Sequence, residues 1–282
     1  VSNADMIKLL DSTSFKLLVL VGDVFQIEAI QFGNWFTIAP DFLPKQAVFH
    51  LEKPWRTSDE GLLDFWAKVR SLDDGIAESI AHYGYSGVLD ETLFTRLRDD
   101  EIILCLNYDG LYGINNINRF LQAGNTGRAA TWRASTYKVG DPVVFGSSGR
   151  FQPLIHNNLK GRIVDVEVAS DHIQFDVWLD RNFSELSVWA IEGLDYVDES
   201  TVRFSVFLPG NTDSDTEDDR SLVPFQVAYA VSIHRSQGLE YESVKLVITD
   251  ANEDDISHGI FYTAVTRARE VLKIYWTPET QQ

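Results

Sequence analysis

Short apolar runs, each bounded by polar or turn residues, recur along this chain and predict buried strands. They cover residues 16–21, 48–51, 102–106, 227–233, 244–249 and 272–276. Runs of this length without alternation are typical of parallel strands that are covered on both faces. Between them we predict helices, one ending near residue 10 and others over residues 59–72, 111–122 and 257–269. Ser58 is the expected N-cap of the helix over 59–72. Strands that alternate with helices indicate an α/β fold.

A different pattern occupies the middle of the chain. Apolar and polar side chains alternate there in three stretches separated by turn residues, at 139–145, 161–168 and 173–179. Alternation with a period of two predicts antiparallel strands. We therefore expect a small β-barrel over residues 138–209, inserted into an α/β domain that is split in sequence.

These patterns suggest a division of the whole chain. We expect residues 48–137 and 222–282 to form the split α/β domain, and residues 1–47 to be the tail of another α/β domain. Residues 210–219 contain five acids and no apolar side chain. Such a stretch cannot pack into a core, so 210–221 is expected to be a mobile loop.

Composition narrows the class of protein. A hydrophobic fraction of 44% in 282 residues is enough for a real core, and 42 acids against 24 bases give a formal charge of −18. That charge argues against a protein wrapped in nucleic acid over its whole surface, but it leaves room for a local basic groove. A single cysteine, the absence of an apolar run long enough to span a membrane, and the absence of a signal-peptide pattern favour a cytoplasmic protein. The chain starts at Val1, and its one methionine is Met6, so we expect that it is not a complete reading frame.

Candidate chemistry follows two of the early predicted strands. GDVFQ at residues 22–26 would place Asp23 and Gln26 at the C-terminal edge of a sheet, where α/β folds bind ligands. A glutamine there can orient water or a terminal phosphate, since its amide both donates and accepts hydrogen bonds. Trp55 and Arg56 follow the second strand, and such a pair can stack on a base and neutralise phosphate charge. Taken alone, GDVFQ is better explained as a strand-terminating turn, and Trp55-Arg56 as an interfacial aromatic beside a solvated arginine.

Two later segments are more specific. SIHRSQGLE at 232–240 contains Gly238, which permits close backbone approach to a phosphate, and Glu240, which could accept hydrogen bonds from a ribose. YTAVTRAR at 262–269 lies on a predicted helix and carries Arg267, a candidate for stabilising charge on a phosphoryl group in the transition state. A charged strand–turn and an ordinary amphipathic helix are the alternatives. No metal-binding spacing of Cys and His and no nucleophile elbow occurs in the sequence.

The order GDVFQ, PWRT, SIHRSQGLEY, YTAVTRAR resembles motifs III to VI of superfamily 1 helicases, especially the RecD-like group. The similarity spans nearly the whole chain, and the last two motifs are the specific ones. The resemblance implies a RecA-like second motor domain carrying an inserted SH3-like barrel, preceded by the tail of a first RecA-like domain. It further implies ATP and Mg²⁺ as cofactors and single-stranded DNA as a partner, with 5′→3′ movement.

The resemblance also implies roles for individual residues. Gln26 would couple the γ-phosphate to DNA. The same phosphate would be contacted from the second domain by Arg56 and Arg267. Nucleotide contacts would come from Trp55, Gln237, Gly238 and Glu240. Nucleic-acid contacts would come from Ser232 and His234, and from the basic residues Arg150, Lys160 and Arg162 of the insert, since residues 142–164 contain no acid.

One departure from the family is large. The glycine-rich phosphate loop with its lysine, and the acidic pair that holds Mg²⁺, do not occur in these 282 residues. We expect that the chain begins just after the second of these motifs, that an N-terminal RecA-like domain is missing, and that the chain alone does not catalyse the reaction. The alternative is a non-catalytic module that binds nucleic acid or protein through its barrel and carries vestigial ATP residues.

Overall fold

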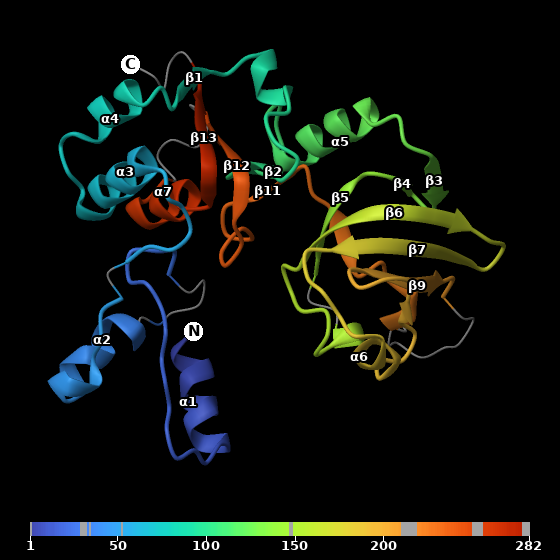
Figure 1. The fold of residues 1–282 in the computed structure, drawn as a ribbon, viewed down its shortest axis with the longest axis horizontal. Coiled ribbons are helices and arrows are strands. Elements are labelled where there is room, and N and C mark those ends of the chain that lie inside the picture. Colours follow the sequence, from blue (N-terminus) through green and yellow to red (C-terminus); the bar gives the residue numbers. More distant parts are fainter. Residues whose placement is uncertain are drawn as a thin grey trace. The chain divides into compact units, whose positions relative to one another are not determined.

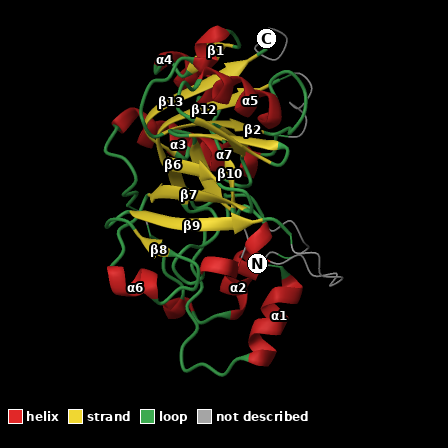
Figure 2. Ribbon diagram, turned by 90° about the vertical axis from the view of Figure 1, so that its right-hand side faces the viewer, coloured by secondary structure: helices red, strands yellow, loops and turns green. Residues whose placement is uncertain are grey.

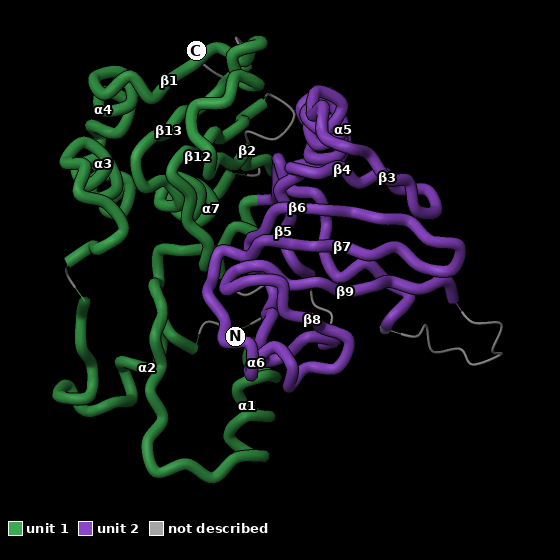
Figure 3. Tube along the Cα trace, turned by 45° about the vertical axis from the view of Figure 1, so that its right-hand side comes forward, with its two compact units in different colours: residues 1–106, 233–282 green, residues 107–232 purple. Residues whose placement is uncertain are grey.

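The computed structural model describes residues 2–28, 33, 35–51, 53–146, 149–209, 219–249 and 256–277. The chain folds into two compact units (Figure 3). The first unit comprises Val1–Leu106 and Ile233–Gln282, and the second comprises Asn107–Ser232. The α/β unit is therefore built from two distant parts of the sequence.

A sheet with strand order β1-β13-β12-β2-β11 supplies the core of the first unit through its first four strands, whereas β11 lies among the residues of the second unit (Figure 1). The pairs β1–β13, β13–β12 and β12–β2 are parallel. Seven of the eight residues of β12 are buried, as expected for a parallel strand covered on both faces. The predicted α/β fold with a parallel sheet is thus confirmed. The strands are β1 (Ser86–Val88), β2 (Glu101–Cys105), β11 (Ala230–Ser232), β12 (Tyr241–Ile248) and β13 (Ala268–Trp276).

Helices α3 and α7 lie side by side against this sheet (Figure 1). Asp59, rather than the predicted Ser58, caps α3, because its carboxylate accepts the Leu62 N–H at 2.8 Å. The helix expected to end near residue 10 continues to Ser12 as α1. The helices of the first unit are α1 (Asn3–Ser12), α2 (Trp35–Phe42), α3 (Glu60–Ser71), α4 (Ile76–His82) and α7 (His258–Val265), with short 3₁₀ turns at Lys45–Ala47 and Glu91–Phe94.

An ion pair between a fully buried lysine and a largely buried glutamate lies within the sheet. Lys245 on β12 donates to the Glu101 carboxylate on β2 at 2.9 Å and to the backbone carbonyls of Leu93 and Thr95 at 2.9 and 2.5 Å. All three protons of the ammonium group are therefore used, which is the condition under which a buried charge is tolerated.

Two strand predictions were wrong. Residues 16–21 and 48–51 form no strand, and most of their apolar side chains are exposed; Val21 and Leu51 are 81% and 86% exposed. A strand requires a neighbouring strand for its backbone hydrogen bonds, and no described ladder includes either run. An apolar run in sequence specifies what a strand would bury, but not whether a partner lies beside it.

An antiparallel sheet forms the second unit, with strand order β10-β5-β6-β7-β9-β8. Figure 2 shows β6, β7 and β9 running next to one another. The predicted alternation holds at the start of β6, where Gly161 and Ile163 are buried. A register shift between Ile163 and Asp165 then breaks it, and Val166 is the next buried residue. The strands are β5 (Pro142–Phe145), β6 (Lys160–Val168), β7 (His172–Leu179), β8 (Asp195–Tyr196), β9 (Thr201–Phe207) and β10 (Phe225–Val227), with a separate hairpin of β3 (Ala129–Trp132) and β4 (Ser135–Lys138).

Helix α5 (Ile114–Gly124) is tied to this unit through Asp141, a carboxylate with no exposed surface. Asp141 accepts hydrogen bonds from Gln122 and Asn125 at 2.6 and 2.7 Å, from Tyr229 at 2.8 Å and from the Lys138 amide at 2.9 Å. Four donors on one carboxylate compensate for its burial. The unit also contains α6 (Glu185–Trp189) and 3₁₀ turns at Gly149–Phe151 and Asp219–Ser221.

The observed division places α5 and the β3–β4 hairpin with the antiparallel sheet, whereas the predicted insert was limited to residues 138–209. The domain assignment, including the tail over residues 1–47, stays a prediction. The acidic loop predicted over 210–221 falls mostly outside the described residues, since 210–218 are not among them, and 219–221 form a short 3₁₀ turn. None of the described helices is long and apolar enough to cross a membrane.

Candidate functional site

Polar contacts from several segments of the first unit meet at the C-terminal end of α7. The predicted helix over 257–269 is too long, because α7 ends at Val265 and β13 begins at Ala268. Pairing of Ala268 with Tyr241 on β12 draws this part of the chain into the sheet. Arg267 therefore lies in the connection, and Arg269 lies on a strand rather than on the predicted helix. The last carbonyls of a helix need donors from outside it, and one comes from Trp66 on α3, whose Nε1 donates to the Val265 carbonyl at 3.1 Å.

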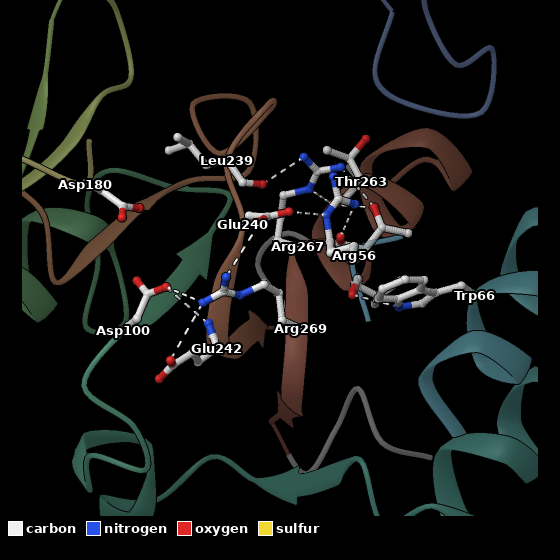
Figure 4. A network of polar contacts seen from close by, with 12 residues as sticks. Arg56, Trp66, Asp100, Asp180, Leu239, Glu240, Glu242, Thr263, Arg267 and Arg269 are labelled. Carbon is white, nitrogen blue, oxygen red and sulfur yellow. Dashed lines mark hydrogen bonds and ion pairs between the residues drawn. The ribbon is translucent and has the colours of Figure 1, made fainter. Parts of the chain in front are cut away.

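Arg267 is buried at this helix end, with 1% of its surface exposed. Its Nε donates to the Thr263 carbonyl at 2.8 Å, and its terminal nitrogens donate to the Leu239 carbonyl at 3.0 Å and to Thr266 Oγ1 at 3.1 Å (Figure 4). Burial lowers the pKa of Arg267 to about 10, and the nearby Arg56 acts in the same direction. The guanidinium is thus held by neutral oxygens, without a carboxylate bonded directly to it among the described contacts.

Arg56 reaches the same helix end from the segment after the second predicted strand. One terminal nitrogen donates to the Thr266 carbonyl at 2.6 Å, and its Nε pairs with the Glu240 carboxylate at 3.1 Å. The negative end of the α7 dipole favours cations at this position. The structure therefore brings Arg56 and Arg267 to the same helix end. Trp55 beside it is 82% exposed, with the Lys53 ammonium 4.1 Å from its ring centroid.

Glu240 links two arginines. Besides pairing with Arg56, it lies 3.7 Å from Nη1 of Arg269, and Arg269 also approaches Asp100 at 3.5 Å and Glu242 at 3.7 Å (Figure 4). The carboxylate predicted to bind a ribose is thus engaged with arginines in this structure. These residues lie where β12, β13 and β2 begin. The cluster therefore occupies the amino-terminal edge of the parallel sheet, opposite to the edge where α/β folds usually bind ligands.

The GDVFQ segment docks on α7. Asp23 accepts hydrogen bonds from Tyr262 Oη at 3.3 Å and from Gln26 Nε2 at 3.4 Å. The Ile27 amide donates to Thr263 Oγ1 at 3.0 Å. Burial, and then the neighbouring Asp23 carboxylate, raise the pKa of Tyr262, so this hydroxyl remains a donor at neutral pH. Gln26 is thus near α7, although not at the end of a strand as predicted.

The loop over 233–240 contributes the remaining residues of this region. Gly238 has a φ of +85°, and no atom lies within 4 Å of where its Cβ would be, so its backbone is open to a ligand. Gln237 Nε2 donates to the Ile27 carbonyl at 3.4 Å. Ser232 is buried on β11, and His234 is exposed at the start of the loop.

The basic residues predicted for the insert do not form one patch. Arg150 donates to the Ser205 carbonyl at 2.8 Å and packs on the Phe151 ring. Lys160 pairs with Asp180 at 3.1 Å, with 15% of its side chain exposed. Arg162 is partly exposed on β6, directly opposite Trp178 on β7. Directly opposed residues share a face of a sheet, so Arg162 and Trp178 lie on one surface.

Sequence reasoning missed several residues of these regions. Trp178 is 41% exposed although its strand is otherwise mostly buried, and its place in the alternation, out of phase with Val177 and Leu179, was the available signal. Trp66 and Thr263 were assigned only to helices. Their hydrogen bonds join segments that are far apart in sequence, so no local pattern could reveal them.

The described residues indicate neither a reactive cysteine nor a metal-binding cluster. Burial raises the pKa of the Cys105 thiol to about 12, which disfavours the reactive thiolate. Within the part of the chain that the structure describes, no three His, Cys, Asp or Glu residues group in a way that could hold a metal ion.

A parallel sheet covered by helices places the first unit in the α/β class, and two arginines meet at the end of one of its helices. Comparison with known families makes this specific: residues 227–275 match the UvrD-like helicase C-terminal domain. The chain is therefore a distant relative of superfamily 1 helicases, which confirms the resemblance inferred from the motifs.

Individual relatives agree with this placement. The chain is 22% identical over 218 residues to the RecBCD enzyme subunit RecD of Buchnera aphidicola from Acyrthosiphon pisum, covering 75% of this chain and 28% of that protein. RecD of the Schizaphis graminum strain is 29% identical over 55 residues, 20% of this chain and 9% of that protein. The chain thus spans little more than a quarter of the first relative. Among solved structures, the Pif1 helicase from Bacteroides in complex with ADP-AlF3 and single-stranded DNA is 17% identical, with 90% of this chain and 60% of that one covered and a TM-score of 0.48.

Proposed function

We propose that this chain is the C-terminal part of an ATP-dependent DNA helicase or translocase that moves 5′→3′ on single-stranded DNA. The observation that carries the proposal is the meeting of Arg56 and Arg267 at the end of α7, next to the open turn at Gly238. Two guanidiniums that meet repel one another, and the Glu240 carboxylate offsets part of that repulsion. A nucleotide phosphate could take the place of this carboxylate. The match to the helicase C-terminal domain supports the same conclusion.

The two arginines have different parts in this proposal. Arg56 is partly exposed and held by one carboxylate, so it can exchange Glu240 for a phosphate oxygen. Arg267 is buried and would have to release the carbonyls of Thr263 and Leu239 before it could touch a ligand. We therefore assign the first phosphate contact to Arg56 and place Arg267 behind it. Gln26, Trp55 and Gln237 complete the nucleotide contacts.

The remaining parts of the motor are inferred from the similarity to superfamily 1 helicases. A first RecA-like domain would supply the phosphate loop and the Mg²⁺ ligands, which do not occur in these 282 residues. When bound between the two domains, ATP would supply the energy for stepping. The antiparallel unit, which follows the Arg56 segment and precedes Ile233 in the chain, would be an SH3-like insert. Its face with Arg162 and Trp178 would contact single-stranded DNA. The contacts implied for Arg150, Lys160, Ser232 and His234 stay predictions.

ATP turnover tests this proposal. The 282-residue chain alone should not hydrolyse ATP, whereas the same protein extended to include a phosphate loop should do so when single-stranded DNA is present. In that longer protein, Arg56→Ala should lower turnover by roughly 10³-fold, because it removes charge stabilisation of the transferring phosphoryl group.

Arg220→Ala is the matched control, since Arg220 is an arginine of the other unit that pairs with an exposed glutamate. Its turnover should stay near that of the unchanged protein. Robust ATP hydrolysis by the 282-residue chain, or an Arg56→Ala variant as active as the control, would overturn the proposal.

A further inference from the structure

One threonine on α7 makes hydrogen bonds in two directions. Thr263 is completely buried. Its side-chain Oγ1 accepts the Ile27 amide at 3.0 Å, and its backbone carbonyl accepts Arg267 Nε at 2.8 Å. A single residue thus joins the segment that carries Gln26 to the buried arginine. Figure 4 shows Thr263 beside the guanidinium of Arg267.

The segment approaches α7 closely at this point. A Cβ on Gly259 would lie 3.2 Å from the Gln26 carbonyl oxygen, so glycine permits the approach. The Phe25 ring packs edge-on against Tyr262 at a centroid distance of 6.2 Å. Gln237 holds the Ile27 carbonyl from the other side. Both polar groups of the Ile27 backbone, the amide and the carbonyl, are therefore hydrogen-bonded to side chains.

The Thr263 hydroxyl matters because the segment has no regular structure of its own. Residues 22–28 belong to no helix or strand, so their backbone groups depend on side chains and turns for hydrogen bonds. Without the hydroxyl, the Ile27 amide would face a buried surface with no acceptor, and the segment would move off α7 to reach water. Arg267 depends equally on fixed carbonyls, because no water replaces them at 1% exposure.

We propose that Thr263 is a positioning residue that fixes the Gln26 segment relative to the Arg267 guanidinium. Displacement of the segment would then free the guanidinium from its hydrogen bond to the Thr263 carbonyl. Its meaning for phosphoryl transfer rests on the proposed function, but the positioning itself does not. The geometry also gives Arg267 a route out of its buried position: movement of residues 23–28 shifts Thr263, and with it the carbonyl that holds Nε.

The test compares Thr263→Val, which keeps the shape and removes the hydroxyl, with Thr263→Ser, which keeps the hydroxyl. Two readouts are taken on the 282-residue chain without ligand. Amide hydrogen exchange of residues 23–28 reports the segment, and the rate of phenylglyoxal modification at Arg267, mapped by mass spectrometry, reports the arginine. In Thr263→Val both rates should rise about tenfold or more. In Thr263→Ser both should stay close to those of the unchanged chain.

Two controls distinguish coupling between residues 23–28 and Arg267 from a general rise in the flexibility of the protein. Arg269, already partly exposed, should keep its modification rate in every variant. Thr201→Val alters a buried threonine of the other unit and should change neither readout at residues 23–28 or Arg267. If that variant raised both rates as well, the effect would be unspecific and the proposal would fall.

Gly259→Ala provides a second approach should Thr263→Val not fold. The added methyl group would press on the Gln26 carbonyl without altering Thr263 or Arg267. We expect a smaller rise in both rates. Faster exchange in the segment with unchanged Arg267 reactivity, in either variant, would refute the coupling, and so would no change in exchange at all. Because neither readout needs nucleotide or DNA, this outcome is independent of the ATPase test of the proposed function.

Discussion

At the residue scale, the arginines show how strongly position changes the part that one side-chain type plays. Arg267 is buried and bonded to neutral oxygens, Arg56 is shared between a helix carbonyl and Glu240, and Arg269 lies among acids at the sheet edge. In the sequence, Arg267 and Arg269 look like equivalent members of one motif. Burial and hydrogen-bond partners distinguish them, and each has a partner more than twenty positions away, Leu239 for Arg267 and Glu240 for Arg269.

This difference predicts unequal effects on stability. Arg267→Ala removes the donor of the Leu239 carbonyl and one of the two side-chain donors of the Thr263 carbonyl, and it should lower the free energy of unfolding by about 2–4 kcal/mol. Arg269→Ala removes only partly exposed ion pairs and should cost less than about 1 kcal/mol. Urea unfolding of the two variants measures both values. Equal unfolding midpoints for Arg267→Ala and the unchanged chain would show that Arg267 has no structural part, and any loss of activity on its removal would then be purely catalytic.

At the element scale, β12 shows how a charged residue is accommodated inside a parallel sheet. Lys245 is buried among apolar neighbours, and its ammonium is satisfied by Glu101 on β2 and by carbonyls of the connection before that strand. The apolar run at 244–249 was correctly predicted as a strand in spite of this lysine. Its partners could not be predicted, because β2 and β12 are about 140 residues apart in sequence.

Removing one member of this pair should be costly. Lys245→Met leaves the Glu101 carboxylate buried without its cation and should lower the free energy of unfolding by about 3–5 kcal/mol. Adding Glu101→Gln to that variant should restore part of the loss, since it removes the uncompensated charge. Urea unfolding of the single and double variants provides the comparison. A double variant that is less stable than Lys245→Met would contradict the account of Lys245 as an ion-pair partner.

At the scale of the whole molecule, charge limits where nucleic acid could bind. The net charge is −18, so most of the surface should repel a phosphate backbone. On the antiparallel unit, Arg162 and the exposed ring of Trp178 share a face. The nearby acids are paired, Asp165 with Arg128 and Asp176 with Arg203. This combination of a stacking ring and a cation is what sequence-independent binding of a single strand requires.

Single-stranded DNA binding by the 282-residue chain tests that surface. Trp178→Ala should weaken binding of an oligothymidylate by about 1–3 kcal/mol, because base stacking is lost. Arg162→Ala should weaken it and reduce the dependence of affinity on salt by about one counterion. Fluorescence anisotropy over a salt series measures both effects. Trp189, an exposed tryptophan of the same unit, supplies the control, and a Trp189→Ala variant as weak as Trp178→Ala would remove Trp178 from the binding surface.

The sequence by itself determined the alternation of apolar runs that makes an α/β unit, the period-two stretches of the second unit, and the order of four motifs that indicates kinship with superfamily 1 helicases. These are local signals, since side-chain periodicity and motif spacing are properties of short segments. Only the tertiary structure decided that residues 16–21 pair with no described strand, that α7 stops at Val265, and that Thr263 joins Ile27 to Arg267. Each of these depends on which distant backbone group lies within hydrogen-bond reach, and that is set by the packing of the whole unit.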